Sequence, residues 1–282
     1  MTAQARIENT VARPMQTRRS WRLPAIQDPR QLAEARTLGH NAVQWLVRLA
    51  HSFCSHEHGN RHVVLEWDPD GRTVSTRPFA KDITTEMKLP SYELQFREGG
   101  KPVPHIMNLE ERSPAQVEAW ILVELLHRGL DRDRFSKELP HKVPNLLVGD
   151  HEDYAPEGCA AQTEELNVWF DNAALVLQQL AAEHGAGASL VCWPDRFQLG
   201  FGIPLGGDAA SRRGLRVGLS AGDERYAEPY FFVAAEGDGA VEQPHPGSVL
   251  AASRIVAERM SAEDVAAVLR TAITTNTKRL AN

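Results

Sequence analysis

The sequence predicts an α+β protein of two similar halves, each with a helix, three mainly antiparallel strands and a second helix. In several long segments, apolar residues recur at spacings of three and four, which indicates helices packed on a core. Between these segments, apolar and polar residues alternate, as in strands with one buried face. The loops between these strands are too short for crossover helices, which favours antiparallel pairing.

The first half begins with the clearest helix pattern. Over 29–53, apolar residues repeat along one face, which predicts a helix with one buried side. Strand-like segments follow at 63–67, 73–76 and 92–96. A second helix is expected after Ser113, because serine is a common helix cap and Gln116 stands where a capping box requires it.

The second half repeats this order after an irregular connector. Residues 130–162 show no sustained period, which predicts a connection mostly without regular structure. Thr163 is expected to cap the next helix and Ser261 the last one. Strands are expected between them at 197–203, 215–220 and 230–233. The predicted division is a polar N-terminal extension over 1–28, a first half over 29–129, a connector over 130–162 and a second half over 163–282. The alternative is one compact domain.

The composition is that of an ordinary globular chain, and it argues against several classes of function. The 282 residues carry a formal net charge of −6, so no overall positive field favours nucleic acid or an anionic membrane. No apolar run approaches the roughly 20 residues of a membrane-spanning helix. Three cysteines do not suggest a disulfide framework, which favours a reducing, cytoplasmic compartment. A small molecule is therefore favoured over nucleic acid or membrane as the partner, and the oligomeric state is not indicated.

Two segments of the second half carry a resemblance to known proteins. One is Trp193 followed by proline at a strand start; the other, over 220–233, reads Ser-Ala-Gly-Asp-Glu-Arg-Tyr-Ala-Glu-Pro-Tyr-Phe-Phe-Val. In these features, over about 30–275, the chain resembles a family of uncharacterised bacterial proteins of the domain-of-unknown-function kind. Where the family pattern has histidines, this chain has Asp195 and a single His245. The resemblance implies an intact fold and no assigned activity.

The first candidate site is the polar face of the second-half sheet. Apolar residues at alternate positions of 197–203 and 215–220 must face a core, so the residues between them face the other way. Glycines inside strands often mark close approach of a ligand, and an adjacent arginine can hold a carboxylate or phosphate. The expected residues on and around this face are Gly200, Gly202, Arg216, Gly218, Trp193, Asp195, Tyr226 and Tyr230. The alternative is a solvated face or a helix packed over the glycines.

Carboxylates gather in the turn before the expected strand at 230–233. They are Asp223, Glu224 and Glu228, interleaved with tyrosines. Clustered carboxylates can bind a hard cation, or shift one another's pKa and serve as acid and base. The alternative is a solvated or salt-bridged group.

A histidine-rich loop is a second, weaker candidate, in this case for a metal. Its ligands would be His51, Cys54, His56 and His58, which combine imidazole and thiolate as zinc prefers. The spacing matches no standard zinc module, and solvated histidines at a helix end are the alternative.

Two further histidines are candidate ligand-binding residues. His40 lies in the middle of the first helix, and it can pair across the fold with His62, which lies with Glu66 at the first strand. The alternative is that each is a core histidine bonded to a backbone carbonyl.

These observations favour the binding of a small polar or anionic ligand at the second-half sheet. One alternative is a metal-assisted or acid/base hydrolase that uses some of Asp195, Asp223, Glu224, Glu228 and His245. Another is a protein-interaction module with exposed aromatic residues at Tyr226, Tyr230 and Phe231. The sequence contains no nucleophile elbow, Walker loop or dinucleotide fingerprint, and it assigns no cofactor and no catalytic residue.

Overall fold

The fold is α+β, as the sequence predicts, and is built on one large sheet. The computed structural model describes residues 19–24, 29–80, 82–186, 189–205, 213–237, 240–241 and 244–281. Within these ranges eleven strands form the sheet, and all of their pairings are antiparallel. Most of the expected extension over 1–28, and residues 206–212 between the expected strands at 197–203 and 215–220, lie outside the described residues.

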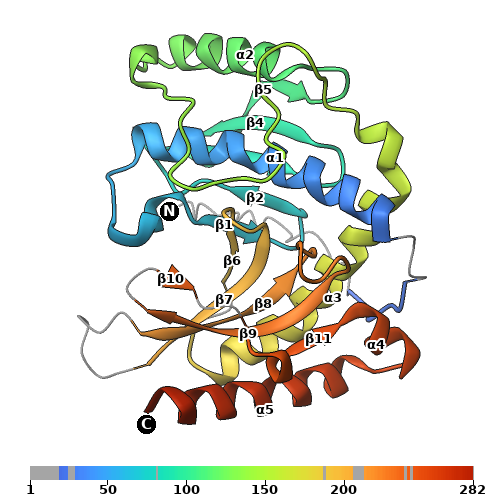
Figure 1. Ribbon diagram of the computed structural model, residues 1–282. Helices are drawn as coiled ribbons and strands as arrows, with labels where there is room; N and C mark the ends of the chain where they lie inside the picture. The colour runs from blue at the N-terminus through green and yellow to red at the C-terminus, as the bar shows by residue number, and fades with distance from the viewer. Residues whose placement is uncertain are drawn as a thin grey trace, which may run out of the picture.

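The first half consists of a long helix, five strands and a second helix (Figure 1). Its elements are α1 (Pro29–Phe53), the 3-10 helix η1 (His58–Val63), β1 (Leu65–Asp68), β2 (Thr73–Ser75), β3 (Ile83–Lys88), β4 (Glu93–Glu98), β5 (Lys101–Asn108) and α2 (Pro114–His127). The predicted bounds of α1 are confirmed.

The second half has the same general order. Its elements are α3 (Ala160–Glu183), β6 (Leu190–Trp193), β7 (Gln198–Pro204), β8 (Gly214–Ser220), β9 (Tyr230–Gly237), β10 (Ala240–Val241), η4 (Pro246–Ser248), β11 (Val249–Ala251), α4 (Ala252–Ala257) and α5 (Ala262–Ala281). None of the helices in the described ranges combines the length and the apolar character that a transmembrane span requires.

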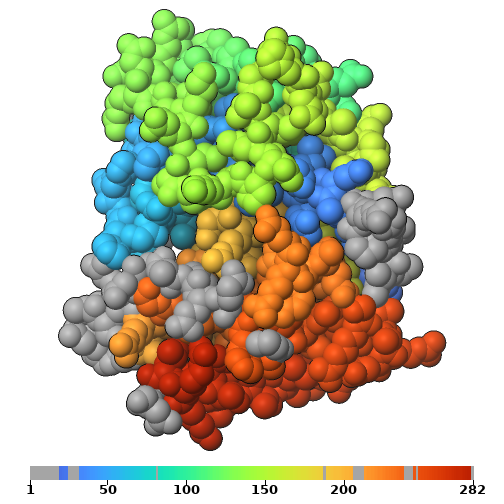
Figure 2. All heavy atoms as spheres, in the orientation of Figure 1, coloured from blue at the N-terminus to red at the C-terminus, as the bar shows by residue number. Residues whose placement is uncertain are grey.

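The two halves join in the middle of the sheet, where β1 pairs antiparallel with β6. The strand order is β10-β9-β8-β7-β6-β1-β2-β3-β4-β5, and β11 also pairs with β9. Helix α1 packs against α3, while α3 contacts β6 to β8 and α5 contacts β8 and β9. One hydrophobic core runs through both halves. Figure 2 shows the halves in contact, with the first above the second.

Alternation along the strands decides which face of the sheet the helices cover. The apolar residues predicted for β7 and β8 are buried in the main core, and they are Leu199, Phe201, Ile203, Leu215, Val217 and Leu219. Residues between them point to the opposite side of the sheet, here called the open face. In register, Glu66 of β1, Gly200 of β7 and Gly218 of β8 lie in one row on this open face.

Each half has more strands than the three that the sequence predicted. The additional strands include β3, β5 and β6. Strand β5 contains prolines at 102 and 104, which disfavour a strand because proline donates no hydrogen bond to a ladder. They are tolerated because β5 is the last strand of the sheet order, with one unpaired edge. Strand β6 has 4 residues, too few for alternation to stand out.

The helix caps divide into confirmed and wrong predictions. Ser113 and Gln116 form the predicted capping box of α2. Ser261 Oγ accepts the backbone N–H of Asp264 at 3.2 Å, as expected for the cap of α5. Thr163 does not cap α3, which begins at Ala160; its Oγ1 lies 3.4 Å from the Tyr92 hydroxyl in the interior.

The segment between α2 and α3 lies along α1. Apart from the 3-10 helices η2 (Arg132–Arg134) and η3 (Pro156–Cys159), it has no helix or named strand. A polar stripe on α1, made of Asn41, Gln44 and Arg48, is buried beneath it. These side chains hydrogen-bond to Lys137, His141, Asn145 and Leu147 of the segment. The stripe explains why a core helix carries three buried polar residues, since each has a partner.

Candidate ligand-binding site

The open face of the second half is not bare, contrary to the sequence interpretation. A Cβ built on Gly200 would lie 2.8 Å from the Trp193 ring, and one on Gly218 would lie 3.1 Å from the Phe232 ring. These two glycines therefore make room for aromatic side chains of the protein itself. Trp193 and Phe232 belong to a small second hydrophobic cluster together with Tyr230 and Ala234.

Gly202 differs from Gly200, although both lie on the same face of β7. The nearest atom to a Cβ at Gly202 would be the backbone oxygen of Leu215, at 3.9 Å. The space above Gly202 is therefore open. Its partner across the ladder is Arg216 of β8, so an arginine stands beside the gap that the glycine leaves.

Arg216 is a buried cation. Its side chain is 8% exposed, and Nη2 donates to Glu236 Oε1 at 3.0 Å. The guanidinium carbon lies 4.8 Å from the centroid of the Trp193 ring, within range of a cation–π interaction. Asp195 Oδ1 is 3.8 Å from Nη1. Nε and Nη1 have no hydrogen-bond partner in the described part of the chain.

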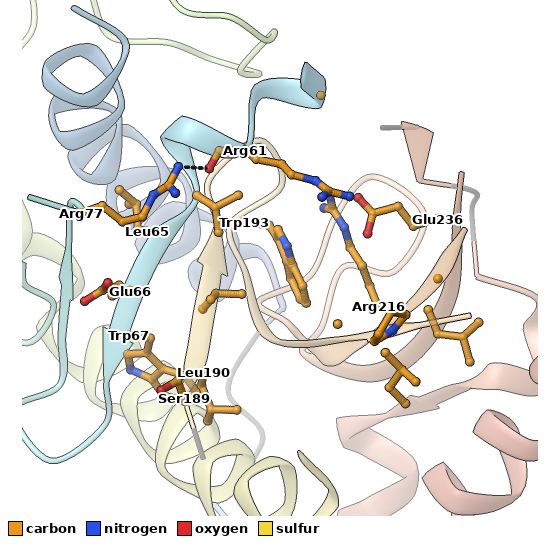
Figure 3. Close-up of a pocket in the computed structure, with 18 of the residues that line it drawn as sticks. Arg61, Leu65, Glu66, Trp67, Arg77, Ser189, Leu190, Trp193, Arg216 and Glu236 are labelled. Atoms are coloured by element: carbon orange, nitrogen blue, oxygen red, sulfur yellow. Dashed lines mark hydrogen bonds and ion pairs between the residues drawn. The ribbon is translucent and has the colours of Figure 1, made fainter. Parts of the chain in front are cut away.

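A cavity of about 860 Å³ opens beside Arg216 on the open face. It extends over β1, β6, β7 and β8, and residues of η1 and β2 also line it. In Figure 3, Arg61, Arg216 and Glu236 point toward one another from η1, β8 and β9. The volume is in the range of sites that hold small molecules.

Two of the four arginines that line the cavity are not neutralised by a described carboxylate. Arg77 pairs with Glu57 at 2.9 Å, and Arg216 has the ion pair given above. Within the described ranges, the guanidinium groups of Arg61 and Arg213 make no hydrogen bond and no ion pair. Both side chains belong to exposed residues.

Besides Glu57 and Glu236, which pair with arginines, two carboxylates of β1 line the cavity. Asp68 uses its carboxylate locally, accepting the backbone N–H groups of Asp70 and Gly71 at 3.0 and 3.2 Å. Glu66 is exposed on β1, and in Figure 3 it lies on the same side of the cavity as Arg77, away from Arg61 and Arg216. The cavity therefore has a basic end at η1 and β8.

The carboxylates of the predicted acidic turn do not converge on this cavity. Asp223 accepts the backbone N–H groups of residues 225 and 226 at 2.8 Å each and the Tyr230 hydroxyl at 2.6 Å. Glu228 accepts the backbone N–H and hydroxyl of Ser253 at 2.6 and 2.8 Å. Glu224 is exposed. Two of these three carboxylates thus have structural partners.

The aromatic residues of this turn are also placed differently from expectation. Tyr230 and Phe231 are buried, which contradicts the expected exposed aromatic surface, and Tyr226 is half-buried against Tyr230. Burial raises the pKa of the Tyr230 hydroxyl, which donates to Asp223. Neither tyrosine lines the cavity, whereas Trp193 does. Asp195 is not part of the lining, and its carboxylate lies 3.8 Å from Arg216 Nη1.

His40 connects α1 to the second half. Its Nε2 donates to the carbonyl of Pro194 at 2.9 Å, and Gln44 Nε2 donates to the same oxygen at 2.9 Å. The ring stacks on Phe197. Burial lowers the pKa of His40 to about 4, so it is neutral at pH 7. His40 is thus bonded to a backbone carbonyl, the alternative considered from the sequence.

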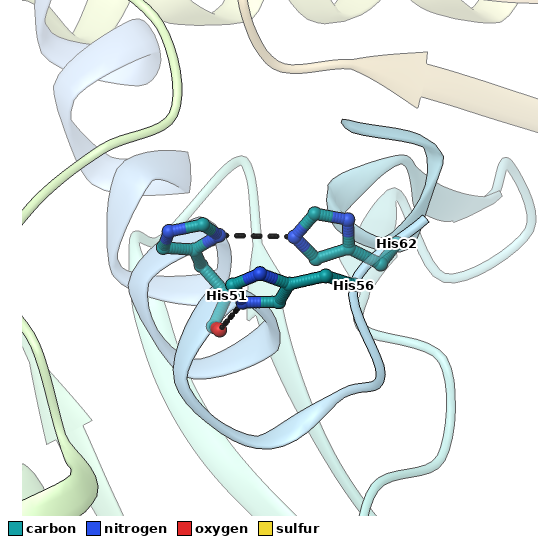
Figure 4. A group of neighbouring side chains, drawn as sticks. All are labelled: His51, His56 and His62. Atoms are coloured by element: carbon teal, nitrogen blue, oxygen red, sulfur yellow. Dashed lines mark hydrogen bonds between the residues drawn. The ribbon is translucent and has the colours of Figure 1, made fainter. Parts of the chain in front are cut away.

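Three of the histidine candidates meet at the end of α1 (Figure 4). His62 Nδ1 accepts the backbone N–H of Glu57 at 3.2 Å, so its Nε2 carries the proton and donates to His51 Nδ1 at 2.9 Å. His56 Nε2 donates to the His51 carbonyl at 3.0 Å. Burial lowers the pKa values of His51 and His62. A metal bound through His51 Nδ1 or His62 Nδ1 would displace the hydrogen bond that this nitrogen accepts.

The remaining candidates of this loop lie outside that cluster. Cys54 is half-buried, and burial raises the pKa of its thiol, which disfavours the thiolate that a metal needs. His58 is exposed. His62 bonds to His51 and His40 bonds to Pro194, so the expected pairing of His40 with His62 across the fold does not form. His245, considered for the hydrolase alternative, is exposed and accepts the backbone N–H of Gly247.

Sequence reasoning found the strand face and missed much of the cavity wall. Arg61, Glu66 and Arg77 come from the first half and reach the site only because β1 pairs with β6. No local pattern marks this pairing. Comparison with protein families, curated proteins and solved structures found no match. The resemblance noted from the sequence therefore stays a prediction.

Proposed function

We propose that the protein binds a small anionic ligand, bearing a carboxylate or phosphate group, in the cavity on the open face. The observation that carries the proposal is a pair of guanidinium groups, Arg61 and Arg213, that make no ion pair with the described residues and stand in the wall of a cavity of about 860 Å³. Guanidinium groups bind carboxylate and phosphate through paired N–H donors.

Arg216 supports the same end of the cavity from below. Its guanidinium group forms an ion pair with Glu236 and lies over the Trp193 ring, so these contacts hold it in place. It adds positive potential at this end of the cavity, but it is not the main exposed donor. Gly202 keeps this part of the floor free of side chains. The apolar side chains of the wall on the open face, Val64, Val191 and Trp193, suit the non-charged part of an organic molecule.

The test is calorimetric titration of purified, tag-free protein with two probes, inorganic phosphate and citrate. Arg61→Gln and Arg213→Gln each remove one exposed donor, and the expected loss is about 10-fold to 100-fold in affinity for the better probe. Arg216→Ala is expected to weaken the same probe by about 1.5–3 kcal/mol, the scale of a charge-assisted hydrogen bond.

Arg132→Gln provides the matched control, because Arg132 is an exposed arginine of η2 that does not line the cavity. It should leave binding unchanged. Mass spectrometry of material released from the freshly purified protein identifies any anion that is retained. The proposal fails if neither probe binds at millimolar concentration, or if Arg132→Gln weakens binding as much as the cavity variants do.

A further inference from the structure

Glu124, near the end of α2, is a buried carboxylate held from one side. Its side chain is 2% exposed, and Oε2 accepts a hydrogen bond from Arg128 Nη1 at 2.8 Å. The Arg128 guanidinium is itself buried over the Phe96 ring, at 4.6 Å from the centroid. A carboxylate fixed through one oxygen presents the other in a set direction.

Two histidines converge on that second oxygen. His105 Nδ1 lies 3.0 Å from Glu124 Oε1, and His127 Nδ1 lies 3.5 Å from it. His127 follows Glu124 by three residues and so shares its face of α2. His105 comes from β5. The pairing of β5 with β4 shifts register here, because Gln95 pairs with Ile106 while Arg97 pairs with Pro102. Such bulges redirect side chains, and this one stands beside His105.

The separations of the two Nδ1 atoms from Glu124 Oε1 fit a tetrahedral metal ion, and the three side chains offer ligand atoms that all lie within 4.8 Å of one another. Zinc–nitrogen and zinc–oxygen bonds of about 2.0–2.1 Å at tetrahedral angles place ligand atoms about 3.3 Å apart. The two measured separations from Glu124 Oε1, 3.0 and 3.5 Å, lie on either side of this value. The His105 and His127 side chains are 59% and 55% exposed, so solvent reaches the ligand atoms.

We propose that Glu124 Oε1 and the Nδ1 atoms of His105 and His127 bind a divalent metal ion of the zinc type. Two imidazoles and a carboxylate are ligands that zinc accepts, and Arg128 orients the carboxylate from outside the coordination shell. Three protein ligands leave one position for water or a substrate, the arrangement of catalytic rather than structural zinc. The ion also links the edge strand β5 to α2.

The histidine cluster at the end of α1 shows what distinguishes this site. There, His51 and His62 use their ring lone pairs in hydrogen bonds to each other and to the backbone. At the second cluster His105 Nδ1 donates to Glu124 Oε1 at 3.0 Å, and His127 Nδ1 lies 3.5 Å from the same carboxylate oxygen. An ion that replaces the Nδ1 protons there keeps its ligands where they already lie.

Calorimetric titration of EDTA-treated, tag-free protein with Zn²⁺ tests the proposal. Wild type should bind one ion per chain with micromolar or tighter affinity. The variant His105→Ala/His127→Ala should bind about 100-fold more weakly or not at all, since it lacks two ligands. Both side chains are more than half exposed, so the variant should keep its fold, which circular dichroism checks.

His51→Ala/His56→Ala is the matched control and should retain the affinity of wild type. Bound Co²⁺ should give the intense visible absorption of four-coordinate geometry in wild type and in this control, and none in His105→Ala/His127→Ala. The proposal is overturned if wild type binds no Zn²⁺ at millimolar concentration, or if affinity depends on His51 and His56 instead.

Discussion

The open faces of the two halves are one continuous surface with two different characters. A single row of residues in register crosses it: Glu86, Ser75, Glu66, Val191, Gly200, Gly218 and Phe232. In the first half the row is polar, and Glu86 pairs with Arg97 of the next strand at 3.0 Å. In the second half glycines replace side chains, and aromatic rings and Arg216 fill part of the space.

This difference teaches where a cavity can form in an antiparallel sheet. Polar side chains of an exposed face stand side by side and pair with neighbours, as Glu86 and Arg97 do. A glycine leaves space above the sheet because it has no side chain, but this space stays open only where no aromatic ring of the protein covers the glycine. Gly200 is covered by Trp193, whereas Gly202 is not, and the cavity lies on the side of Gly202.

The largest expected effect is the difference in the free energy of unfolding between alanine substitutions at Gly200 and at Gly202. Gly200→Ala would place a Cβ 2.1 Å from the Val217 carbonyl and against the Trp193 ring, so we expect a loss of about 3 kcal/mol or more in the free energy of unfolding. Gly202→Ala meets nothing closer than 3.9 Å and should change stability by less than about 1 kcal/mol. Urea denaturation followed by tryptophan fluorescence measures both. Equal losses would show that the two positions are alike.

The next effect concerns the contact between halves at Pro194. The pKa of His40 is about 4 when folded against 6.5 when unfolded, so between these values only the unfolded chain binds the proton. Stability should therefore fall as the pH drops from 6.5 to 4, by about 2 to 3 kcal/mol from this residue. His40→Gln should flatten that slope relative to wild type in urea denaturation across this window. An unchanged slope would mean that other groups cause it.

The same comparison explains what the sequence reveals and what it does not. The bounds of α1, the cap at Ser113 and the buried faces of β7 and β8 follow from local periods, which neighbouring residues specify. The aromatic cover of Gly200 does not, because Trp193 reaches it across a ladder. Glu124 and the two histidines beside it were likewise missed, since His105 comes from an edge strand that carries prolines.

The candidate cavity shows the same limit. The sequence placed Arg216 on the open face, because alternation fixes which side a strand residue takes, and it expected Trp193 near the rim; both residues line the cavity. It also placed Tyr226 and Tyr230 in the wall, because the turn leaves the end of β8. The Tyr230 hydroxyl bonds to Asp223, and the true far wall comes from Arg61 of the other half. Long-range pairing, rather than local pattern, decides the composition of the wall.

The smallest predicted effect compares one arginine from each half of the open face. Arg97 is 31% exposed and pairs with Glu86, so Arg97→Ala should cost less than about 1 kcal/mol. Arg216 is 8% exposed, and Arg216→Ala removes its contact with Trp193 and leaves Glu236 without its ion-pair partner. We expect a loss of about 2 kcal/mol, because a partly buried charge is then uncompensated.

Urea denaturation of both single variants, and of Arg216→Ala/Glu236→Gln, completes this comparison. If the unpaired carboxylate is the main cost, the second substitution should restore roughly half of the loss, since a neutral amide needs less compensation. If the contact with Trp193 is the main cost, Glu236→Gln should restore nothing while Arg216→Lys is almost as harmful as Arg216→Ala, because an ammonium group cannot stack as a guanidinium does. Equal costs for Arg97→Ala and Arg216→Ala would contradict the distinction drawn between the two halves of the face.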